Sequence, residues 1–216
     1  MAEFTTVSTA GLDTPTAYRL LTGSVAPRPI AWITTADADG RANAAPFSAY
    51  NFVSHSPPML AVNIASRNGQ LKDTARNILA SGEFVVNVAT VDTLDLMHES
   101  ASDFGPDVSE PDVLELQLLP GRYVRAPRLA RSPIHMECRL ECSMPLGRGI
   151  NTLYIGEVLA FHLSSDVYDG RYIDSRKLQP VARLGGPNYA TLGEIITRER
   201  RDAGAFQTAR PGTPAP

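Results

Sequence analysis

Three scarcities limit what this 216-residue chain can be: it has two cysteines, no long apolar run and no excess of basic residues. The formal net charge of −3 gives no electrostatic support for nucleic-acid binding. No run approaches the roughly 18 apolar residues that a membrane-spanning helix requires. Residues 1–6 contain neither the basic nor the apolar segment of a secretory signal. We therefore expect a cytoplasmic protein that binds neither nucleic acid nor membrane.

The two cysteines, Cys138 and Cys142, lie four residues apart in a segment of alternating character. In a strand this spacing places their Cα atoms about 13 Å apart, whereas a disulfide needs less than about 7 Å. Both are in phase with the apolar positions of residues 134–144, so we expect two buried thiols. No CxxC, HxH or HExxH spacing occurs, which disfavours a zinc site, and we expect no metal.

We expect one domain over residues 13–202, because no internal repeat or linker divides this part of the chain. A chain of this length is sufficient for one sizeable core. Residues 1–12 and 203–216 lack apolar periodicity, and we expect both to be flexible tails.

Most of the ordered segments are rich in β-forming residues, and few have a helical pattern. The expected strands are residues 30–35, 42–49, 59–64, 83–88, 134–144 and 153–163. Asp39-Gly40, between the first two, is a strong hairpin signal. The expected helices are a short one opened by Asp13-Thr14-Pro15, one over 73–80 that ends at Gly82, and one over about 91–101. So few helices among hairpin-linked strands indicate an antiparallel barrel rather than a doubly wound sheet.

Residues Asn43 to Phe52 form the first of three unusual clusters. Small residues, a proline and several hydroxyl or amide groups allow a flat ligand to approach the backbone closely. The alternative is a strand end with a bulge, because proline interrupts the hydrogen bonding of a ladder.

Residues Ser66 to Thr74 form the second cluster, a polar loop with one glycine that joins an expected strand to an expected helix. Exposed helix N–H groups, the helix dipole, and Arg67 or Lys72 would together suit a phosphate. We assign Asp73 or Thr74 to capping the helix. The alternative is a capped surface helix with solvated charges. The segment is neither a Walker loop nor a GxGxxG motif.

Residues Ala182 to Tyr189 form the third cluster, in which Gly185-Gly186-Pro187 permits a sharp turn that presents the ring of Tyr189. The alternative is a simple turn. The four histidines are dispersed and form no recognisable catalytic set. His162 interrupts an apolar strand, where a satisfied barrel histidine is the alternative to a proton donor. The acidic residues of 103–112 lack EF-hand spacing, so we expect a solvated loop.

In their order and spacing, the three clusters resemble the flavin reductase-like family with the FMN-binding split barrel, which includes flavoredoxin-like proteins. The resemblance spans about Thr16 to Tyr189. The matching stretches are PRPIAWITT (27–35), DG (39–40), NAAPFS (43–48), PP (57–58), KDT with Asn77, GEFVVN (82–87), GEV (156–158) with His162, DG (169–170), and ARLGG (182–186) with Tyr189. Their ordered sum, rather than any one of them, is specific for the family.

The resemblance implies a mainly β fold with peripheral helices: a six-stranded antiparallel Greek-key split β-barrel. It implies a homodimer with the flavin near the subunit interface. It implies FMN as the cofactor, with FAD as an alternative, and NAD(P)H as the co-substrate. The implied cofactor-binding residues are Arg28, Asn43, Ala45, Pro46, Phe47, Ser48, Ser66, Arg67, Lys72 and Thr74. In this set, residues 45–48 would line the ring and ribityl chain, and Ser66, Arg67, Lys72 and Thr74 would hold the phosphate through charge-assisted hydrogen bonds.

The implied activity is that of an NAD(P)H-dependent flavin reductase, which transfers hydride to flavin N5 while the protein positions and tunes the ring. This chemistry requires no acid–base residue; His162 and Tyr189 are the candidates for contacting the nicotinamide or closing the pocket. The reduced flavin would supply a partner monooxygenase. Two alternatives stay open: an FMN-bound electron carrier or reductase of another acceptor, and a non-catalytic FMN-binding module.

Overall fold

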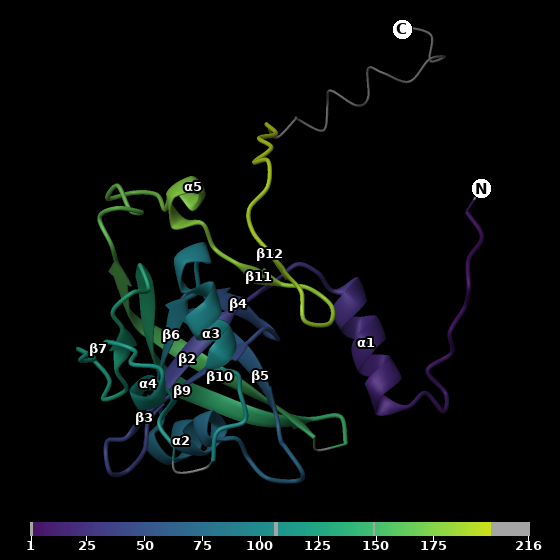
Figure 1. Cartoon of the computed structure of the whole chain (residues 1–216), viewed down its shortest axis with the longest axis horizontal. Helices are drawn as coiled ribbons and strands as arrows, with labels where there is room; N and C mark the ends of the chain where they lie inside the picture. The colour runs from purple at the N-terminus through teal and green to yellow at the C-terminus, as the bar shows by residue number, and fades with distance from the viewer. Residues whose placement is uncertain (1, 106–107, 149, 200–216) are drawn as a thin grey trace, which may run out of the picture.

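A computed structural model of the chain describes residues 2–105, 108–148 and 150–199. Figure 1 shows a β-barrel with helices around it, and with α1 to one side. The helices are α1 (Thr14–Ser24), α2 (Asp73–Ser81), η1 (Val91–Thr93), α3 (Leu94–Glu99), α4 (Glu110–Val113) and α5 (Ser175–Leu178). The strands of the main sheet are β2 (Ala31–Ala36), β3 (Ala42–Phe47), β4 (Tyr50–His55), β5 (Pro58–Ala65), β6 (Glu83–Val88), β9 (Ile134–Leu146) and β10 (Asn151–Leu163). The short strands are β1 (Arg28–Pro29), β7 (Leu118–Leu119), β8 (Arg128–Leu129), β11 (Ala182–Arg183) and β12 (Tyr189–Ala190).

The main sheet follows the order β3-β2-β6-β9-β10-β5-β4, and every neighbouring pair is antiparallel. β6, β9 and β10 are successive neighbours, and β5 lies beside β10, which is a Greek-key arrangement. The expected mainly β split-barrel fold is confirmed. The main sheet has seven strands rather than six, because the chain forms a further strand, β4, directly after β3.

The turns and helix ends follow from local sequence. Gly40, in the turn between β2 and β3, has φ of 83°, which glycine adopts without strain. Asp13 caps α1, because its Oδ1 accepts the N–H of Thr16 at 2.7 Å. Gly82 ends α2 in the left-handed conformation, and its N–H donates to the Ile78 carbonyl at 2.8 Å. The expected helix over about 91–101 is divided between η1 and α3.

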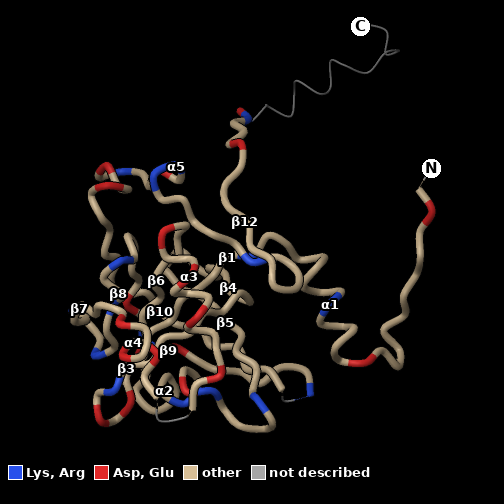
Figure 2. The backbone as a smooth tube through the Cα atoms, viewed as in Figure 1, with Lys and Arg blue, Asp and Glu red and all other residues tan. Residues whose placement is uncertain are grey.

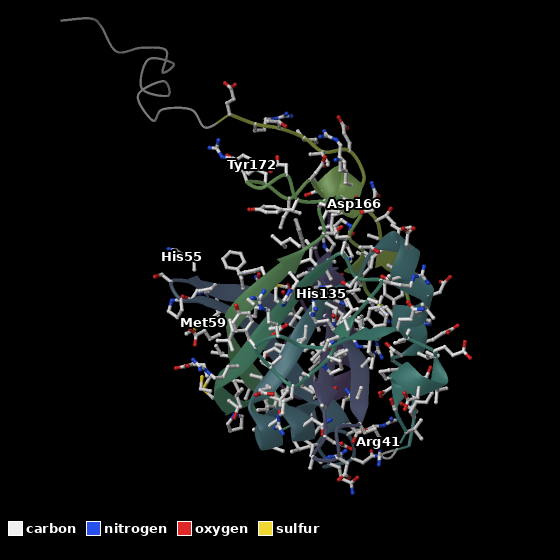
Figure 3. All side chains as sticks on the ribbon, turned by 90° about the vertical axis from the view of Figure 1, so that its left-hand side faces the viewer. Arg41, His55, Met59, His135, Asp166 and Tyr172 are labelled. Atoms are coloured by element: carbon white, nitrogen blue, oxygen red, sulfur yellow. The ribbon has the colours of Figure 1, made fainter. Side chains whose placement is uncertain are left out.

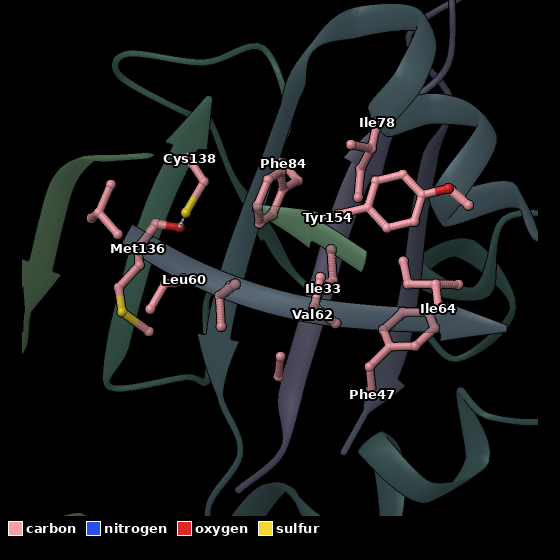
Figure 4. Packing of buried hydrophobic residues seen from close by; sticks show 14 residues of the cluster. Ile33, Phe47, Leu60, Val62, Ile64, Ile78, Phe84, Met136, Cys138 and Tyr154 are labelled. Carbon is pink, nitrogen blue, oxygen red and sulfur yellow. Dashed lines mark hydrogen bonds between the residues drawn. The ribbon is translucent and has the colours of Figure 1, made fainter. Parts of the chain in front are cut away.

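The barrel interior is filled by apolar side chains that alternate along the strands, as Figure 4 shows for Ile33, Val62, Phe84 and Tyr154. Each is almost fully buried, and burying such a side chain contributes about 1.5–3 kcal/mol. Gly156 of β10 lets Phe84 lie close, because a Cβ at this position would be 2.4 Å from Phe84 Cζ.

The outer face of β6 and β9 is also covered. Val85 packs against Val124 and Ala126, which belong to the segment preceding β8. Glu137 of β9 lies under the same segment and is 0% exposed. The first five residues of β9, from Ile134, are therefore buried on both faces.

Beyond Cys138, β9 continues into a long hairpin with β10, in which residues 141–145 of β9 are exposed on both faces. Cys138 is buried as expected, but the expectation was wrong for Cys142, which is exposed; both thiols are free. The register of β9 against β10 shifts between Leu140 and Cys142, so the alternation that predicted a shared face for Cys138 and Cys142 is interrupted there. Met144, on the face of Cys142, is 51% exposed.

The N-terminal segment of residues 2–12 contains no helix or strand and lies outside the barrel. The expected C-terminal tail, 203–216, is outside the described residues. Within the described part of the chain, no helix is both long enough and apolar enough to cross a membrane.

Candidate functional site

Two of the three sequence clusters meet on one side of the barrel. β3 carries the first half of the first cluster, and the β5–α2 connection with the start of α2 carries the second cluster. With the connection between α3 and α4 they surround a groove of about 300 Å³, hereafter the β3–α2 groove. Seven of the ten predicted cofactor-binding residues line it: Asn43, Ala45, Pro46, Phe47, Arg67, Lys72 and Thr74. Figure 2 shows residues of both charges along the turns around α2.

β3 forms one wall of the groove. It is the end strand of the main sheet, so one backbone edge has no neighbouring strand in that sheet. Pro46, which pairs in register with Trp32 of β2, is tolerated there because an end strand can spare an N–H group. The buried Asn43 side chain donates its Nδ2 to Thr74 Oγ1 at 2.8 Å, which ties β3 to α2. Ala45 and Pro46 are compact, so a flat ring can approach this wall.

The N-terminal end of α2 forms a second wall. The helix has Lys72 as its N-cap residue, and no side chain caps it. The expectation that Asp73 or Thr74 caps the helix was wrong, because both lie inside it. Asp73 Oδ1 instead forms an ion pair with Arg76 Nη2 at 2.6 Å, and Thr74 Oγ1 accepts the hydrogen bond from Asn43 Nδ2. The N-cap side chain therefore makes no capping bond to the first-turn N–H groups of α2, an arrangement that favours an anion at this helix end.

The β5–α2 connection places Arg67 at the rim of the groove. Arg67 and Gln70 exchange backbone hydrogen bonds of 2.8 Å across a tight turn. Asn68 and Gly69 occupy this turn with φ of 49° and 76°, which asparagine and glycine tolerate. The Arg67 guanidinium donates to both carboxylate oxygens of Asp103 on the α3–α4 connection.

Glu110 is a buried carboxyl group in the groove that the sequence did not indicate. Its Oε2 accepts the N–H of Ala44 at 3.1 Å. Burial raises the pKa of Glu110, partly offset by this bond and reinforced by Asp73. The expected solvated acidic loop was wrong here, because Ser109 caps a short helix, α4, that begins at Glu110. The motif Ser109-Glu110-Pro111, a cap residue followed by a first-turn proline, could have predicted this helix. Asp107 of the expected loop lies outside the described residues.

The other three predicted cofactor-binding residues do not line the groove. Arg28 donates to the carbonyls of Val25 at 2.5 Å and Leu184 at 2.9 Å, and so joins the end of α1 to β11. Its Nε is 3.4 Å from Ser48 Oγ, in the turn after β3. Ser66 donates its hydroxyl to the Ile150 carbonyl at 3.1 Å.

His162 is bound to Glu137 and lies apart from the groove residues. Its Nε2 is 2.7 Å from Glu137 Oε1. The ring of its cross-strand partner His135, labelled within the body in Figure 3, lies 6.2 Å away. Burial raises the pKa of Glu137, but backbone N–H donors and His162 outweigh burial, so the net pKa is lowered. Burial also lowers the pKa of His135. This geometry supports a structural role for His162 in the single chain.

Tyr189 also lies apart from the groove residues. Its hydroxyl is 2.9 Å from His98 Nδ1, and the Arg183 guanidinium is 4.5 Å from the centroid of its ring. The third cluster forms the turn between β11 and β12, with Gly186 at φ of 63°. The turn therefore presents the ring of Tyr189, as expected, but the ring lies against His98 of α3.

The chemistry of the groove is that of binding. Arg67, Lys72 and the N–H groups of α2 suit a phosphate, and β3 suits a flat ring. Among the described residues, no three His, Cys, Asp or Glu side chains are grouped to hold a metal ion.

The comparisons with known proteins agree with the fold. Residues 23–180 match the flavin reductase-like domain family. The uncharacterised protein YwrF from Bacillus subtilis is 41% identical over 192 residues, which covers 86% of this chain and 94% of that protein.

Two solved structures are similar along nearly their whole length. Nitrilotriacetate monooxygenase component B from Bacillus cereus has a TM-score of 0.89 and 33% identity, covering 92% of this chain and 100% of that one. The 2-nitrobenzoate 2-nitroreductase NbaA from Pseudomonas fluorescens has a TM-score of 0.84 and 30% identity, covering 92% of this chain and 98% of that one. From its fold, its ordered motifs and these similarities, the chain belongs to the flavin reductase-like family.

Proposed function

We propose that the protein is an FMN-binding oxidoreductase, an NAD(P)H-dependent flavin reductase whose β3–α2 groove holds the flavin. One observation carries the proposal: compact residues on an end strand and the cationic, uncapped start of a helix line the same groove. A flavin mononucleotide needs both surfaces, one for its ring and one for its phosphate.

The residues present fit the parts of FMN. Arg67, Lys72 and Thr74, with the first-turn N–H groups of α2, would hold the phosphate dianion. Residues 45–47 would lie along the ring, with Asn43 nearby. Lys72 Nζ is 5.7 Å from the centroid of the Phe47 ring, so the cationic and flat surfaces adjoin. Two cations suit one phosphate, which favours FMN over FAD.

The remaining predicted residues support the groove. Arg28 and Ser48 would continue the β3 wall, and Ser66 would fix the start of the β5–α2 connection. A bound flavin supplies a hydride acceptor at N5. The chain's own groups bind the phosphate, orient the ring and shield one of its faces. In a single chain neither His162 nor Tyr189 lines the groove, so a nicotinamide-contacting role for them would require the second subunit.

The proposed active form is a cytoplasmic homodimer with the groove near the subunit interface. Large apolar side chains are exposed on α1 and on the end strand β4, including Tyr18, Leu21, Phe52 and Val53. An exposed apolar strand at a sheet edge favours association, and a second copy of the chain would cover it. Light scattering should give the mass of two chains, and a monomer at micromolar concentration would contradict this part of the proposal.

The proposed role is to supply reduced flavin to a separate monooxygenase. The similarity to component B of a monooxygenase supports this role. The similarity to a 2-nitrobenzoate nitroreductase favours a second candidate, in which the bound flavin reduces a nitroaromatic acceptor directly. Turnover with free FMN against turnover with 2-nitrobenzoate, at equal NAD(P)H, distinguishes the two.

The first experiment is the absorption spectrum of the purified protein with FMN, before and after anaerobic addition of NADH or NADPH. We expect a bound flavin that bleaches within seconds to minutes with one of the nucleotides. A bound flavin inert to both would refute the reductase in favour of an electron carrier. A protein that binds neither FMN nor FAD would refute the flavin proposal.

The phosphate assignment has its own test. Arg67→Ala with Lys72→Ala should weaken FMN on the order of 100-fold, because two charge-assisted contacts are lost, and should leave riboflavin nearly unchanged. The matched control is Arg171→Ala with Lys177→Ala, which removes the same charge from exposed positions outside the groove. Equal losses for FMN and riboflavin would contradict the assignment.

A further inference from the structure

The groove lining contains more acidic than basic side chains. Beside the cations Arg67 and Lys72 it has three carboxyl groups, Asp73, Asp103 and Glu110. Two of these are engaged within the fold: Asp73 pairs with Arg76, and Glu110 accepts the Ala44 N–H. The third, Asp103, forms an ion pair with Arg67, one of the two cations assigned to the phosphate.

The Arg67–Asp103 pair uses the donors that a phosphate would need. Nη1 of Arg67 donates to Oδ1 of Asp103, and Nη2 donates to Oδ2. This two-bond geometry is the one in which arginine also binds phosphate. An incoming dianion must therefore displace Asp103 from Arg67 or lie beside a like charge. The hydrogen bonds from Arg67 hold the pKa of Asp103 below its usual value, and the charge of Lys72 adds a smaller effect in the same direction.

Of the two residues of this ion pair, Asp103 is the one whose side chain is free to move away when a phosphate binds. The Arg67 backbone is held by the turn that it forms with Gln70, whereas the Asp103 side chain is 68% exposed and Arg67 is 55% exposed. An ion pair this exposed is weak, because water solvates both partners after separation. A dianion held by Arg67, Lys72 and helix N–H groups makes more and stronger contacts than the single carboxylate.

We propose that Asp103 is an internal competitor for the phosphate of the flavin and sets how readily FMN leaves the groove. This inference rests on the proposed function and goes beyond it. It assigns to one exposed carboxylate a several-fold difference in how tightly FMN is held and how fast FMN is released. The competition acts on the phosphate alone, so riboflavin, which lacks it, is unaffected.

The test compares Asp103→Asn with the full-length parent in titrations of FMN and riboflavin, and in the rate of FMN release after rapid dilution. We expect Asp103→Asn to bind FMN about 3- to 10-fold more tightly and to release it more slowly, with riboflavin unchanged. Asp103→Glu, which keeps the charge, should stay within about 2-fold of the parent. Asp166→Asn is the matched control, since it removes the same charge from an exposed loop outside the groove.

The outcomes separate this inference from the proposed function. Unchanged or weaker FMN binding by Asp103→Asn, while Arg67→Ala weakens it, would overturn the role of Asp103 and leave the phosphate site standing. Equal tightening by Asp166→Asn would also overturn it, because the effect would then come from net charge. FMN binding by neither the parent nor Asp103→Asn would refute both.

Discussion

The buried carboxylate of Glu137 allows a direct test of how the outer face of the sheet is held. Glu137 accepts the N–H groups of Arg122 at 2.8 Å, Tyr123 at 2.5 Å and Val124 at 3.1 Å, and it also bonds His162. Glu137→Ala would remove the acceptor for all four donors. The segment that precedes β8 would then lose its attachment to β9.

The expected cost follows from the number and kind of these bonds. A hydrogen bond to a charged group contributes about 1.5–3 kcal/mol, and removing one member of a buried pair costs about 3–5 kcal/mol. The three N–H groups are consecutive and lose their acceptor together, so their losses do not add in full. We expect Glu137→Ala to lower the free energy of unfolding by about 3–5 kcal/mol. For a chain of this length the Tm would fall by roughly 6–20 °C.

Urea denaturation followed by circular dichroism measures this loss. Glu141→Ala, at an exposed position of the same strand, is the matched control and should change the free energy of unfolding by less than about 0.5 kcal/mol. A loss below about 1 kcal/mol for Glu137→Ala would show that the Glu137 carboxylate does not anchor this segment. The pKa of Glu137 is lowered in the fold, so its contribution is present above the unfolded-state pKa and is lost as pH falls through the folded-state value. The difference in free energy of unfolding between the parent and Glu137→Gln should therefore become smaller as the pH is lowered.

Three further predictions concern the core and the groove. Gly156→Ala should lower the free energy of unfolding by about 1–3 kcal/mol, because the added Cβ would meet the Phe84 ring. In thermal denaturation, adding Phe84→Leu to Gly156→Ala should restore part of this loss, and additive losses for the two substitutions would contradict the clash. Asn87→Ala should lower the free energy of unfolding, measured by urea denaturation, by about 2–4 kcal/mol, because the buried Asn87 amide donates to the Trp32 carbonyl and accepts the Leu129 N–H. A change within about 0.5 kcal/mol would contradict this prediction. Burial raises the pKa of Glu110, so the parent should lose stability as pH rises from the unfolded-state to the folded-state pKa, whereas Glu110→Gln should not; parallel profiles of Tm against pH would argue against burial.

Local patterns were sufficient to predict most of the elements. The expected strand 83–88 matches β6 residue for residue, and the expected helix 73–80 differs from α2 by one residue. Both have strong local signals, a β-branched apolar run in one case and a left-handed terminal Gly82 in the other. The strand β4 was missed because one strand was expected over residues 42–49 and residues 43–52 were treated as one cluster; pairing with β5 defines where β4 begins.

The site could be predicted in part. The family resemblance implied that residues 45–47 and Arg67 bind the same ligand, and the fold brings them to one groove. The place of Glu110 in the groove could not be predicted, because its hydrogen-bond donor, the Ala44 N–H, is 66 positions away in the chain. The burial of Glu137 likewise depends on a segment that folds back over β9, and strand alternation carries no information about that segment.

The pairing of Trp32 with Pro46 has an optical consequence. Trp32 is the chain's single tryptophan, is 1% exposed, and lies on the strand beside the groove wall. Tryptophan emission overlaps flavin absorption, so a flavin in the groove would quench Trp32 by energy transfer. Because no second indole contributes background, the ultraviolet emission of the unlabelled chain would fall in proportion to the fraction of grooves filled.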